Sequence, residues 1–206
     1  MARTRGSRDR EYEDRRRKLV ESARARLVQP GGSRASLRDL ARACGVTLPT
    51  LRHYFPSRED LILEVMQENL AQGQIHLEHM AMPNGRFAES VREALSYTAF
   101  GFRQGLGEIH TLGLTEGLRH SDLGPAFVEL VLEPSLDALQ KRLSVHIERG
   151  EMRPIDSRHA ALALLSPVIL AFLHQAELGG SQGHPLQLDR YLSDHADGFI
   201  RGYGIN

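Results

Sequence analysis

Histidines and carboxylates are the groups of this chain that could bind a metal or move a proton. Ten histidines are present, and His76 and His79 lie three residues apart around Glu78, a spacing that puts both rings on one face of a helix. Zinc requires three or four converging ligands, and neither an H-E-x-x-H motif nor a C-x-x-C pair occurs. We therefore predict solvated or hydrogen-bonded histidines, with no metal and no cofactor.

Covalent and phosphate-binding chemistry is also poorly supported. The glycines at positions 101, 105, 107 and 113 are spaced for helix ends and close packing, not for a phosphate-binding loop or a dinucleotide fingerprint. Cys44 is the only cysteine, so no disulfide can form within the chain. We predict that the protein is not an enzyme.

The stretch from Ser36 to Arg58 carries the signals of two short helices joined by a tight turn. Ser36 is a favoured N-cap, and Asp39 three residues later completes a variant of the capping box. Gly45 supplies the positive φ that ends a helix, and Thr47 caps a second helix whose first turn tolerates a proline. This pattern predicts a helix-turn-helix, whose second helix enters the major groove of DNA.

The second helix of this motif divides into an inner and an outer face. Leu51 and Phe55 lie one turn apart and are expected to face inward. Leu48 is compatible with packing inward and with contacting a thymine methyl group. Arg38, at the exposed start of the preceding helix, is placed to bind a guanine with both guanidinium arms. The outward positions of the second helix are Pro49, Thr50, Arg52 and His53.

The segment G-V-T-L-P-T-L-R-H-Y-F-P-S-R-E-D-L resembles the signature of the tetracycline-repressor (TetR) family of bacterial regulators, and the resemblance extends over about residues 12–72. The family usually has Tyr where this chain has Arg52, and often a polar residue where it has Leu48. The resemblance implies that the partner is an operator in double-stranded DNA. The residues that it implies contact bases or phosphates are Arg38, Thr47, Leu48, Pro49, Thr50, Arg52, His53, Tyr54 and Arg58.

Positive charge is concentrated in the N-terminal third. The whole chain has no net charge, but residues 1–72 contain 15 Lys and Arg against 10 Asp and Glu, leaving 11 against 16 for the remainder. This asymmetry favours a basic end that meets phosphates and an acidic body. Simple solvation of exposed helix faces is the alternative.

The first residues of the chain contribute to this charge. Residues 1–11 lack apolar periodicity, so we expect a flexible basic arm ahead of a helix from Arg15 to Gln29. The arm is compatible with insertion into a minor groove and with an ordinary solvated tail. No signal peptide is visible, and the longest apolar run, Ala160–Leu173, is too short to cross a bilayer. We therefore expect a cytoplasmic protein without a membrane partner. The arginines of the arm are Arg3, Arg5, Arg8 and Arg10.

Every readable segment beyond the motif is helical, which predicts an all-α fold. We expect an N-terminal three-helix bundle with the helix-turn-helix over residues 12–72, and a larger helical domain for effector binding and dimerisation over residues 73–206. One helix, from Arg58 to about His79, is shared between them. The other expected helices are Phe87–Phe102, Glu108–Leu118, Leu123–Arg149 with a bend at Pro134, Arg158–Leu178 and Asp189–Tyr203.

The helix Arg158–Leu178 is apolar around most of its circumference, which suggests that it packs on its own core and on a second subunit. Burial within one monomer is the alternative. The TetR resemblance implies a homodimer that pairs its last two long helices. The interface residues we expect are Leu162, Leu165, Ile169, Phe172 and Leu173.

The resemblance also implies a small-molecule effector in an apolar cavity, and the function of a repressor released from a pseudo-palindromic operator. A helical enzyme, or an interaction module that has lost DNA binding, are the competing hypotheses. Because Met, aromatic and Leu residues at helical spacing also form ordinary cores, the candidates for lining a cavity are an expectation only: Met66, Phe100, Phe102, His110, Leu114, Phe127, Leu130, Val131, His146 and His174.

Overall fold

Helices dominate the described part of the chain. The computed structural model describes residues 5–29 and 32–205, and the only β contact within them is an isolated bridge between Met152 and Gly204. The predicted all-α fold is confirmed. The contacts divide the chain into a first unit, Met1–Ala71 with Leu112–Phe127, and a second unit, Gln72–Thr111 with Val128–Asn206. Leu112–Phe127, which we expected in the C-terminal domain, therefore packs in the first unit.

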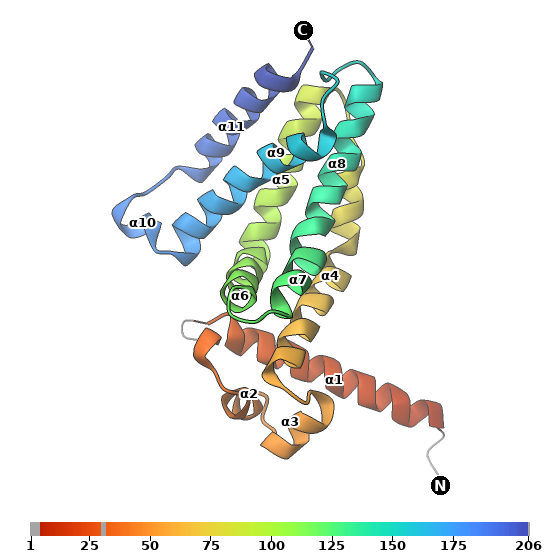
Figure 1. Ribbon diagram of the computed structural model, residues 1–206, viewed down its shortest axis with the longest axis vertical. Helices are drawn as coiled ribbons and strands as arrows, with labels where there is room; N and C mark the ends of the chain where they lie inside the picture. Colours follow the sequence, from red (N-terminus) through yellow and green to blue (C-terminus); the bar gives the residue numbers. More distant parts are fainter. Residues whose placement is uncertain (1–4, 30–31, 206) are drawn as a thin grey trace. The chain divides into compact units, whose positions relative to one another are not determined.

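The first unit contains the helix-turn-helix (Figure 1). Its elements are α1 (Arg5–Leu27), η1 (Gly32–Arg34), α2 (Leu37–Ala43), α3 (Leu48–Tyr54), the start of α4 (Arg58–Ala81), the end of α6 (Gly107–Gly117) and α7 (Leu123–Phe127). Leu51 and Phe55 are buried, as expected, and the other buried apolar residues of this unit include Leu19, Val20, Ala23, Leu27, Leu40, Ala41, Leu61, Ile62, Val65 and Met66.

Helix α1 begins well before the first apolar residue of its inner face. We expected the helix from Arg15 and a flexible arm before it, but α1 starts at Arg5. Arg and Glu are strong helix formers, and Tyr12 adds a tertiary contact that apolar periodicity does not reveal. The expected flexible arm was therefore wrong for residues 5–11. Arg3 and the predicted helix stop at residues 30–31 lie outside the described residues.

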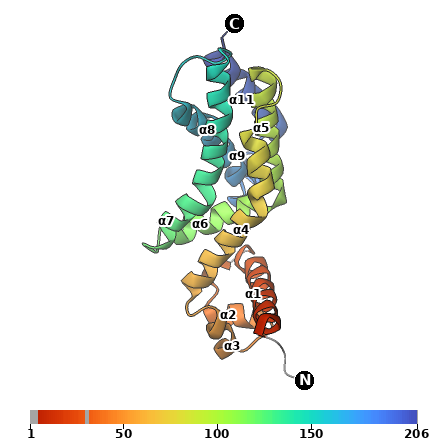
Figure 2. The same ribbon diagram turned by 90° about the vertical axis from the view of Figure 1, so that its right-hand side faces the viewer.

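The second unit is a helical bundle around one apolar cluster (Figure 2). Helix α9 contacts α8 and α11, and α11 contacts α5. The buried cluster draws on all four of these helices and on the end of α4. The elements of this unit after α4 are α5 (Phe87–Gly101), η2 (Phe102–Leu106), the start of α6, η3 (Val128–Leu132), α8 (Glu133–Glu148), α9 (Ser157–Phe172), η4 (Leu173–Glu177), α10 (Gly180–Gly183) and α11 (Leu188–Tyr203).

The long helix expected from Leu123 to Arg149, with a bend at Pro134, is divided by the π-helical turn η3 just before that proline. The segments α7, η3 and α8 follow one another, and Pro134 lies in the first turn of α8, where its missing N–H costs little. Gly150, with a φ of 70°, follows the last turn. The π-helical turns η2, η3 and η4 are a feature that the sequence pattern did not predict.

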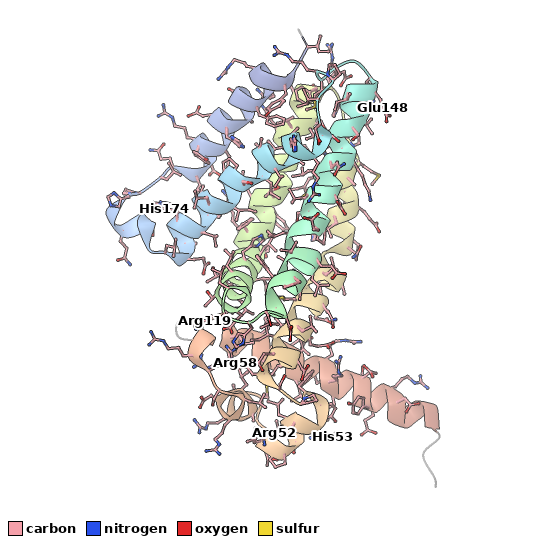
Figure 3. The ribbon with its side chains drawn as sticks, viewed as in Figure 1. Arg52, His53, Arg58, Arg119, Glu148 and His174 are labelled. Atoms are coloured by element: carbon pink, nitrogen blue, oxygen red, sulfur yellow. The ribbon has the colours of Figure 1, made fainter. Side chains whose placement is uncertain are left out.

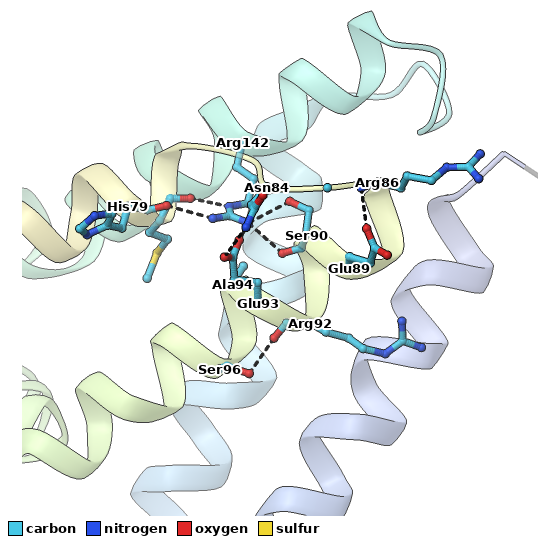
Figure 4. A network of polar contacts seen from close by, with 12 residues as sticks. His79, Asn84, Arg86, Glu89, Ser90, Arg92, Glu93, Ala94, Ser96 and Arg142 are labelled. Carbon is cyan, nitrogen blue, oxygen red and sulfur yellow. Dashed lines mark hydrogen bonds and ion pairs between the residues drawn. The ribbon is translucent and has the colours of Figure 1, made fainter.

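Arg142 ties the end of α4 to α5 and α8 inside the second unit (Figure 4). Its side chain is 1% exposed, and it donates to the backbone oxygens of Met80 at 2.6 Å and His79 at 2.9 Å. It also donates to Ser90 and to the Glu93 carboxylate at 2.9 Å. Carbonyls at a helix C-terminus lack intrahelical partners, so this buried cation satisfies two of them. The predicted end of the helix near His79 is thus fixed by a residue of α8.

The helix Ser157–Glu177, which comprises α9 and η4, is long and apolar enough to cross a membrane by length and composition. Core helices of soluble proteins pass the same test. Ala161, Leu164, Leu165, Val168 and Phe172 are buried in the second unit, so core packing accounts for the apolar character of one side of this helix.

Candidate nucleic-acid interface

Helix α2 begins at a complete capping box, as the sequence predicted. The backbone N of Asp39 donates to Ser36 Oγ at 3.2 Å, and the backbone N of Ser36 donates to Asp39 Oδ2 at 3.0 Å. The Ser36 hydroxyl also donates to Asp39 Oδ2 at 2.6 Å, and this bond, with the one from the Ser36 backbone N, lowers the pKa of Asp39 because both stabilise its charged form. The start of α2, and with it the exposed position of Arg38, is therefore fixed locally.

The turn between α2 and α3 is a Schellman motif. Gly45 has a φ of 66°, the left-handed region that favours glycine. The backbone N of Val46 donates to the oxygen of Ala41 at 3.0 Å, and that of Gly45 to the oxygen of Arg42 at 3.1 Å. Both bonds satisfy carbonyls at the end of α2, so the turn sets the direction in which α3 departs.

Helix α3 has the inner and outer faces that its sequence spacing predicted. Thr47 caps it by accepting a hydrogen bond from the backbone N of Thr50 at 3.3 Å. Leu51 is fully buried and Phe55, one turn later, is 1% exposed. Arg52 and His53 are exposed on the other side (Figure 3). The apolar side anchors the helix while its cationic and imidazole groups stay accessible to a partner.

The nine residues proposed to contact DNA are accessible to different degrees. Arg38, Thr47, Pro49, Arg52 and His53 are exposed, whereas Leu48, Thr50, Tyr54 and Arg58 are half-buried. The Thr50 hydroxyl lies 2.8 Å from that of Thr47, so the two share a hydrogen bond at the N-terminus of α3. All nine come from α2, α3, their caps and the first turn of α4.

Arg58 has partners within the first unit that sequence analysis missed. Its two terminal nitrogens donate to the Glu116 carboxylate at 2.7 and 2.8 Å, and its Nε donates to the backbone oxygen of Ala35 at 2.8 Å. The hydrogen bonds to Glu116 raise the pKa of Arg58. Arg58 is 15% exposed and Glu116 only 1%. We expected Arg58 to meet the DNA backbone, and in the structure its guanidinium forms an ion pair within the first unit.

An aromatic cluster joins α1 to the outer end of α3. The ring of Tyr12 stacks on Tyr54 with centroids 4.7 Å apart, and it meets His53 edge-on at 6.0 Å. His53 and Tyr54 also contact each other at 5.3 Å. Sequence analysis missed this contact because Tyr12 lies ahead of Arg15, where the first helix was expected to begin.

The sequence of this region matches a known family. Residues 19–65 match the sequence model of bacterial regulatory proteins of the tetR family, and they include the whole helix-turn-helix with its caps. Residues 19–65 are therefore a DNA-binding segment of the TetR type. The resemblance seen in the sequence is thereby confirmed, and the family supports the function of a DNA-binding transcriptional regulator. A search of the curated proteins found no match.

Solved structures with the same fold extend over nearly the whole chain. A chain from Mesorhizobium loti assigned to the TetR family is 19% identical, with 98% of this chain and 100% of that chain covered and a TM-score of 0.77. A regulator from Saccharomonospora viridis, solved in complex with choline, is 17% identical, with coverage of 94% and 100% and a TM-score of 0.72. SmeT, the repressor of the Stenotrophomonas maltophilia efflux pump SmeDEF, is 18% identical, with coverage of 93% and 91% and a TM-score of 0.66. At these identities the similarity establishes the fold.

The residues expected to line an effector cavity do not form one group. Met66, Leu114 and Phe127 belong to the first unit, and the other seven belong to the second. Phe102 and His110 do meet, with ring centroids 4.9 Å apart. The remaining members of the second unit are scattered: Phe100 is 49% exposed, Leu130 and His174 are half-buried, Val131 is buried in η3, and His146 is bonded to Glu151 at 2.7 Å.

The Phe102–His110 contact is part of a larger cluster in the second unit. Phe102 also stacks on Phe172 at 4.9 Å, so η2 lies against the end of α9. A Cβ placed on Gly107 would lie 3.6 Å from Phe102 and 3.3 Å from Glu177 Oε1, which puts this carboxylate close to the rings. Burial and the neighbouring Glu108 raise the pKa of Glu177.

The five residues expected at a dimer interface also separate. Leu165 and Phe172 lie in the core of the second unit, 3% and 5% exposed, so a partner could not contact them without repacking that core. Leu162 is 39% exposed, and Ile169 and Leu173 are half-buried. The most exposed apolar side chain of α9 is Leu170, at 64%, which sequence analysis did not select.

One catalytic motif does occur, and sequence analysis passed over it. Gly179–Gly183 has the pattern G-x-S-x-G around Ser181. That motif places a nucleophile at a sharp turn from a strand into a helix, whereas here it lies at α10 in a fully helical surrounding. Ser181 is exposed and does not lie at a turn from a strand into a helix, so we assign it no catalytic role. Among the described residues, no three His, Cys, Asp or Glu side chains are grouped to hold a metal.

Proposed function

We propose that this TetR-family chain is a cytoplasmic, non-enzymatic transcriptional repressor that binds a pseudo-palindromic operator as a homodimer and is released from it by a small molecule. The observation that carries this proposal is helix α3, which is capped by Thr47, buries Leu51 and Phe55 and exposes Arg52 and His53. A twofold dimer presents this helix twice, which is why we expect a symmetric operator.

The proposed DNA contacts follow from chemistry and position. Arg38 is our candidate for reading a guanine, since an exposed guanidinium can donate two hydrogen bonds to its major-groove edge. Thr50 lies in the first turn of α3, where backbone N–H groups and the hydroxyl favour a phosphate. Arg52 and His53 are further candidates for base contacts. Arg58 is left out because Glu116 occupies its guanidinium.

The proposed dimer interface centres on the outer side of α9. Leu162 and Leu170 are exposed there, eight residues apart and so on one side of the helix. With α11 alongside, this side supplies the apolar stripe that a second copy would cover. The family's habit of pairing its last two long helices agrees with this choice, and Leu170 replaces the buried Leu165 and Phe172 at its centre.

We place the effector beside Phe102, His110 and Phe172 in the second unit. Three aromatic rings and a partly buried carboxylate, Glu177, suit a ligand with an apolar body and a cationic group. The relative from Saccharomonospora viridis was solved with choline, which has such a group. Organic cations therefore come first in a thermal-shift screen, followed by neutral apolar compounds.

The proposed response is a population shift. Helix α4 starts in the first unit and ends in the second, where Arg142 holds its last carbonyls. An effector that binds one arrangement of the dimer more tightly changes the spacing of the two α3 helices, by no more than its difference in affinity. DNA must then weaken effector binding by the same factor that the effector weakens DNA binding.

A mobility-shift titration with a duplex from the chain's own upstream region tests the proposal. The expected result is a shift that survives excess random duplex and is reversed by compounds found in the thermal-shift screen. A protein that binds no duplex would support an interaction module or a helical enzyme instead. If the protein binds the duplex but no compound reverses the binding, the proposed regulator stands and the proposed effector response is wrong.

A further inference from the structure

The start of α5, the last turn of α8 and the end of α11 meet at one end of the second unit (Figure 1). In the turn after α8, Oε2 of Glu151 accepts a hydrogen bond from the backbone N of Phe87, the first residue of α5, at 3.0 Å. The same oxygen lies 2.7 Å from Nδ1 of His146 in α8. Two residues later, the backbone N of Arg153 donates to the oxygen of Tyr203 in α11 at 2.8 Å. The turn therefore holds the ends of three helices together.

The Glu151 carboxylate caps α5 from outside that helix. The first N–H groups of a helix have no intrahelical partner, and the positive end of the helix dipole favours a carboxylate. The hydrogen bond with His146 lowers the pKa of Glu151. The carboxylate is therefore ionised and accepts both hydrogen bonds.

The ring of His146 is enclosed at this junction. Its side chain is 0% exposed, and the ring of Phe87 meets it edge-on with centroids 5.6 Å apart. Because an ionised carboxylate only accepts hydrogen bonds, Nδ1 carries the proton of the neutral ring. Nε2 is buried and has no hydrogen-bond partner among the described residues. A second proton, on Nε2, would therefore bury a positive charge and an N–H donor that lacks an acceptor.

The charges on α8 also oppose this second proton. Burial lowers the pKa of His146 most, and the cations Arg149 and Arg142 act in the same direction. The hydrogen bond and the negative charge of Glu151 act in the opposite direction, but burial is the larger effect. The ring is therefore neutral while this end of the second unit is closed.

The other elements around His146 bring no free carboxylate to Nε2. Glu93 of α5 pairs with Arg142 at 2.9 Å. At the start of α9, Arg158 pairs with Glu133 at 2.8 Å, in the first turn of α8, whereas His146 is in the last turn. The ionisable groups of the surrounding elements are Arg142 and Arg149 on α8, Glu151 in the turn, Arg86, Glu89 and Glu93 at and in α5, Arg158 and His159 on α9, and Tyr203 on α11.

We propose that His146 and Glu151 form a proton-sensitive latch, in which the neutral imidazole holds the turn after α8 against the start of α5 and the end of α11, and a proton on Nε2 opens this end of the second unit. The inference goes beyond the proposed regulator and does not depend on DNA binding. Acidification is then an input to this chain that needs neither an effector nor an operator.

The direction of the pH dependence follows from where the proton binds. An imidazole released from the latch takes up a proton near pH 6.5, whereas the enclosed ring takes up none in that range. The latch is therefore at full strength above pH 6.5, and opening becomes about tenfold easier for each pH unit below it, until the enclosed ring is itself protonated. Glu151, with its lowered pKa, adds a loss of the same sign only near and below its ordinary value of 4.5.

Amide hydrogen exchange at pH 7.5 and 5.5, resolved by NMR, tests the latch at the amides of Phe87 and Arg153. The variant His146→Asn keeps an amide donor near the position of Nδ1 and does not titrate. The matched control is His184→Asn, because His184 is an exposed histidine of the second unit. The amide of Phe55, bonded to the oxygen of Leu51 at 2.9 Å, reports on the first unit.

After correction for intrinsic exchange, the native chain and the control should lose about tenfold protection at Phe87 and Arg153 between pH 7.5 and 5.5. His146→Asn should lose little, since only the titration of His146 differs. Protection at Phe55 should stay constant in all three. An equal loss in the native chain and His146→Asn would overturn the latch, and so would a loss of the same size at Phe55.

The imidazole resonances of the native chain give a second test, which decides the matter even if His146→Asn does not fold. The ring of His146 should still be neutral at pH 6, with its proton on Nδ1, whereas a free imidazole side chain is mostly protonated there. A ring of His146 that is already protonated at pH 6 in the folded chain would overturn the inference.

Discussion

Arg38 and Arg42 are both exposed on α2. Arg38 lies in the first turn, which the capping box fixes, whereas Arg42 lies in the last turn and pairs with Asp39 at 3.5 Å. We predict that Arg38→Ala weakens binding to the operator by about 1–3 kcal/mol and relaxes specificity at one base pair per half-site. Arg42→Ala, the matched control, should change it little. The measurement is a titration on operator and random duplex, and equal weakening on both would make Arg38 a phosphate contact.

Gly45 and Gly73 give a second matched pair. A Cβ at either position would meet nothing within 4 Å, so steric clash is excluded at both. Gly45 has a φ of 66°, and an alanine there should cost about 1–2 kcal/mol of stability. Gly73 lies inside α4, where alanine should add about 0.5–1 kcal/mol. Urea unfolding of the two variants measures both changes, and the same sign in both would contradict this account of the turn.

Single residues were predictable from sequence where their partners are close in the chain. Ser36 with Asp39, and Thr47 with Thr50, are three residues apart, and both caps were expected. Arg58 with Glu116 is separated by 58 residues, and no local pattern indicates such a pair. The family resemblance pointed Arg58 to DNA because it carries over positions, not the contacts of this particular chain.

At the scale of elements, the Arg58–Glu116 pair joins the first turn of α4 to the last turn of α6 within the first unit. Removing one partner leaves a buried charge unpaired, so Arg58→Ala and Glu116→Ala should each cost about 3–5 kcal/mol. The double variant Arg58→Ala with Glu116→Ala should cost clearly less than the sum. Chemical unfolding of the three variants gives the coupling energy, and additive costs would show that the pair is not a stabilising unit.

Most elements were predictable because their apolar periodicity and helix-ending residues agree. The helices after Arg58 end within a few residues of the expected positions, and Pro134 and Gly150 mark the break and the stop. The start of α1 was missed because its first turns are held by charged helix formers and by Tyr12, not by a periodic core face. The place of Leu112–Phe127 in the first unit was missed because it depends on contacts such as Arg58–Glu116.

At the scale of the whole molecule, assembly can now be tested at a better position than the sequence suggested. Phe172 is buried in its own core, so a charge there would test folding. Leu170 is 64% exposed on α9, and Leu170→Asp should give a folded monomer in sedimentation because a charge would be buried in the interface. Leu118→Asp, at an 86% exposed leucine after α6, is the control and should leave a dimer. A native chain that sediments as a monomer at micromolar concentration would contradict the proposed dimer.

The central claim, that the exposed side of α3 reads DNA, is tested most directly by the double variant Arg52→Ala with His53→Ala in a fluorescence titration on the upstream duplex and on random duplex. Both side chains are exposed, so the variant should keep its fold by circular dichroism. The native chain should prefer the upstream duplex by about a thousandfold or more. The variant should bind it hardly better than random duplex. A variant with the full native preference, or a native chain with none, would contradict the claim.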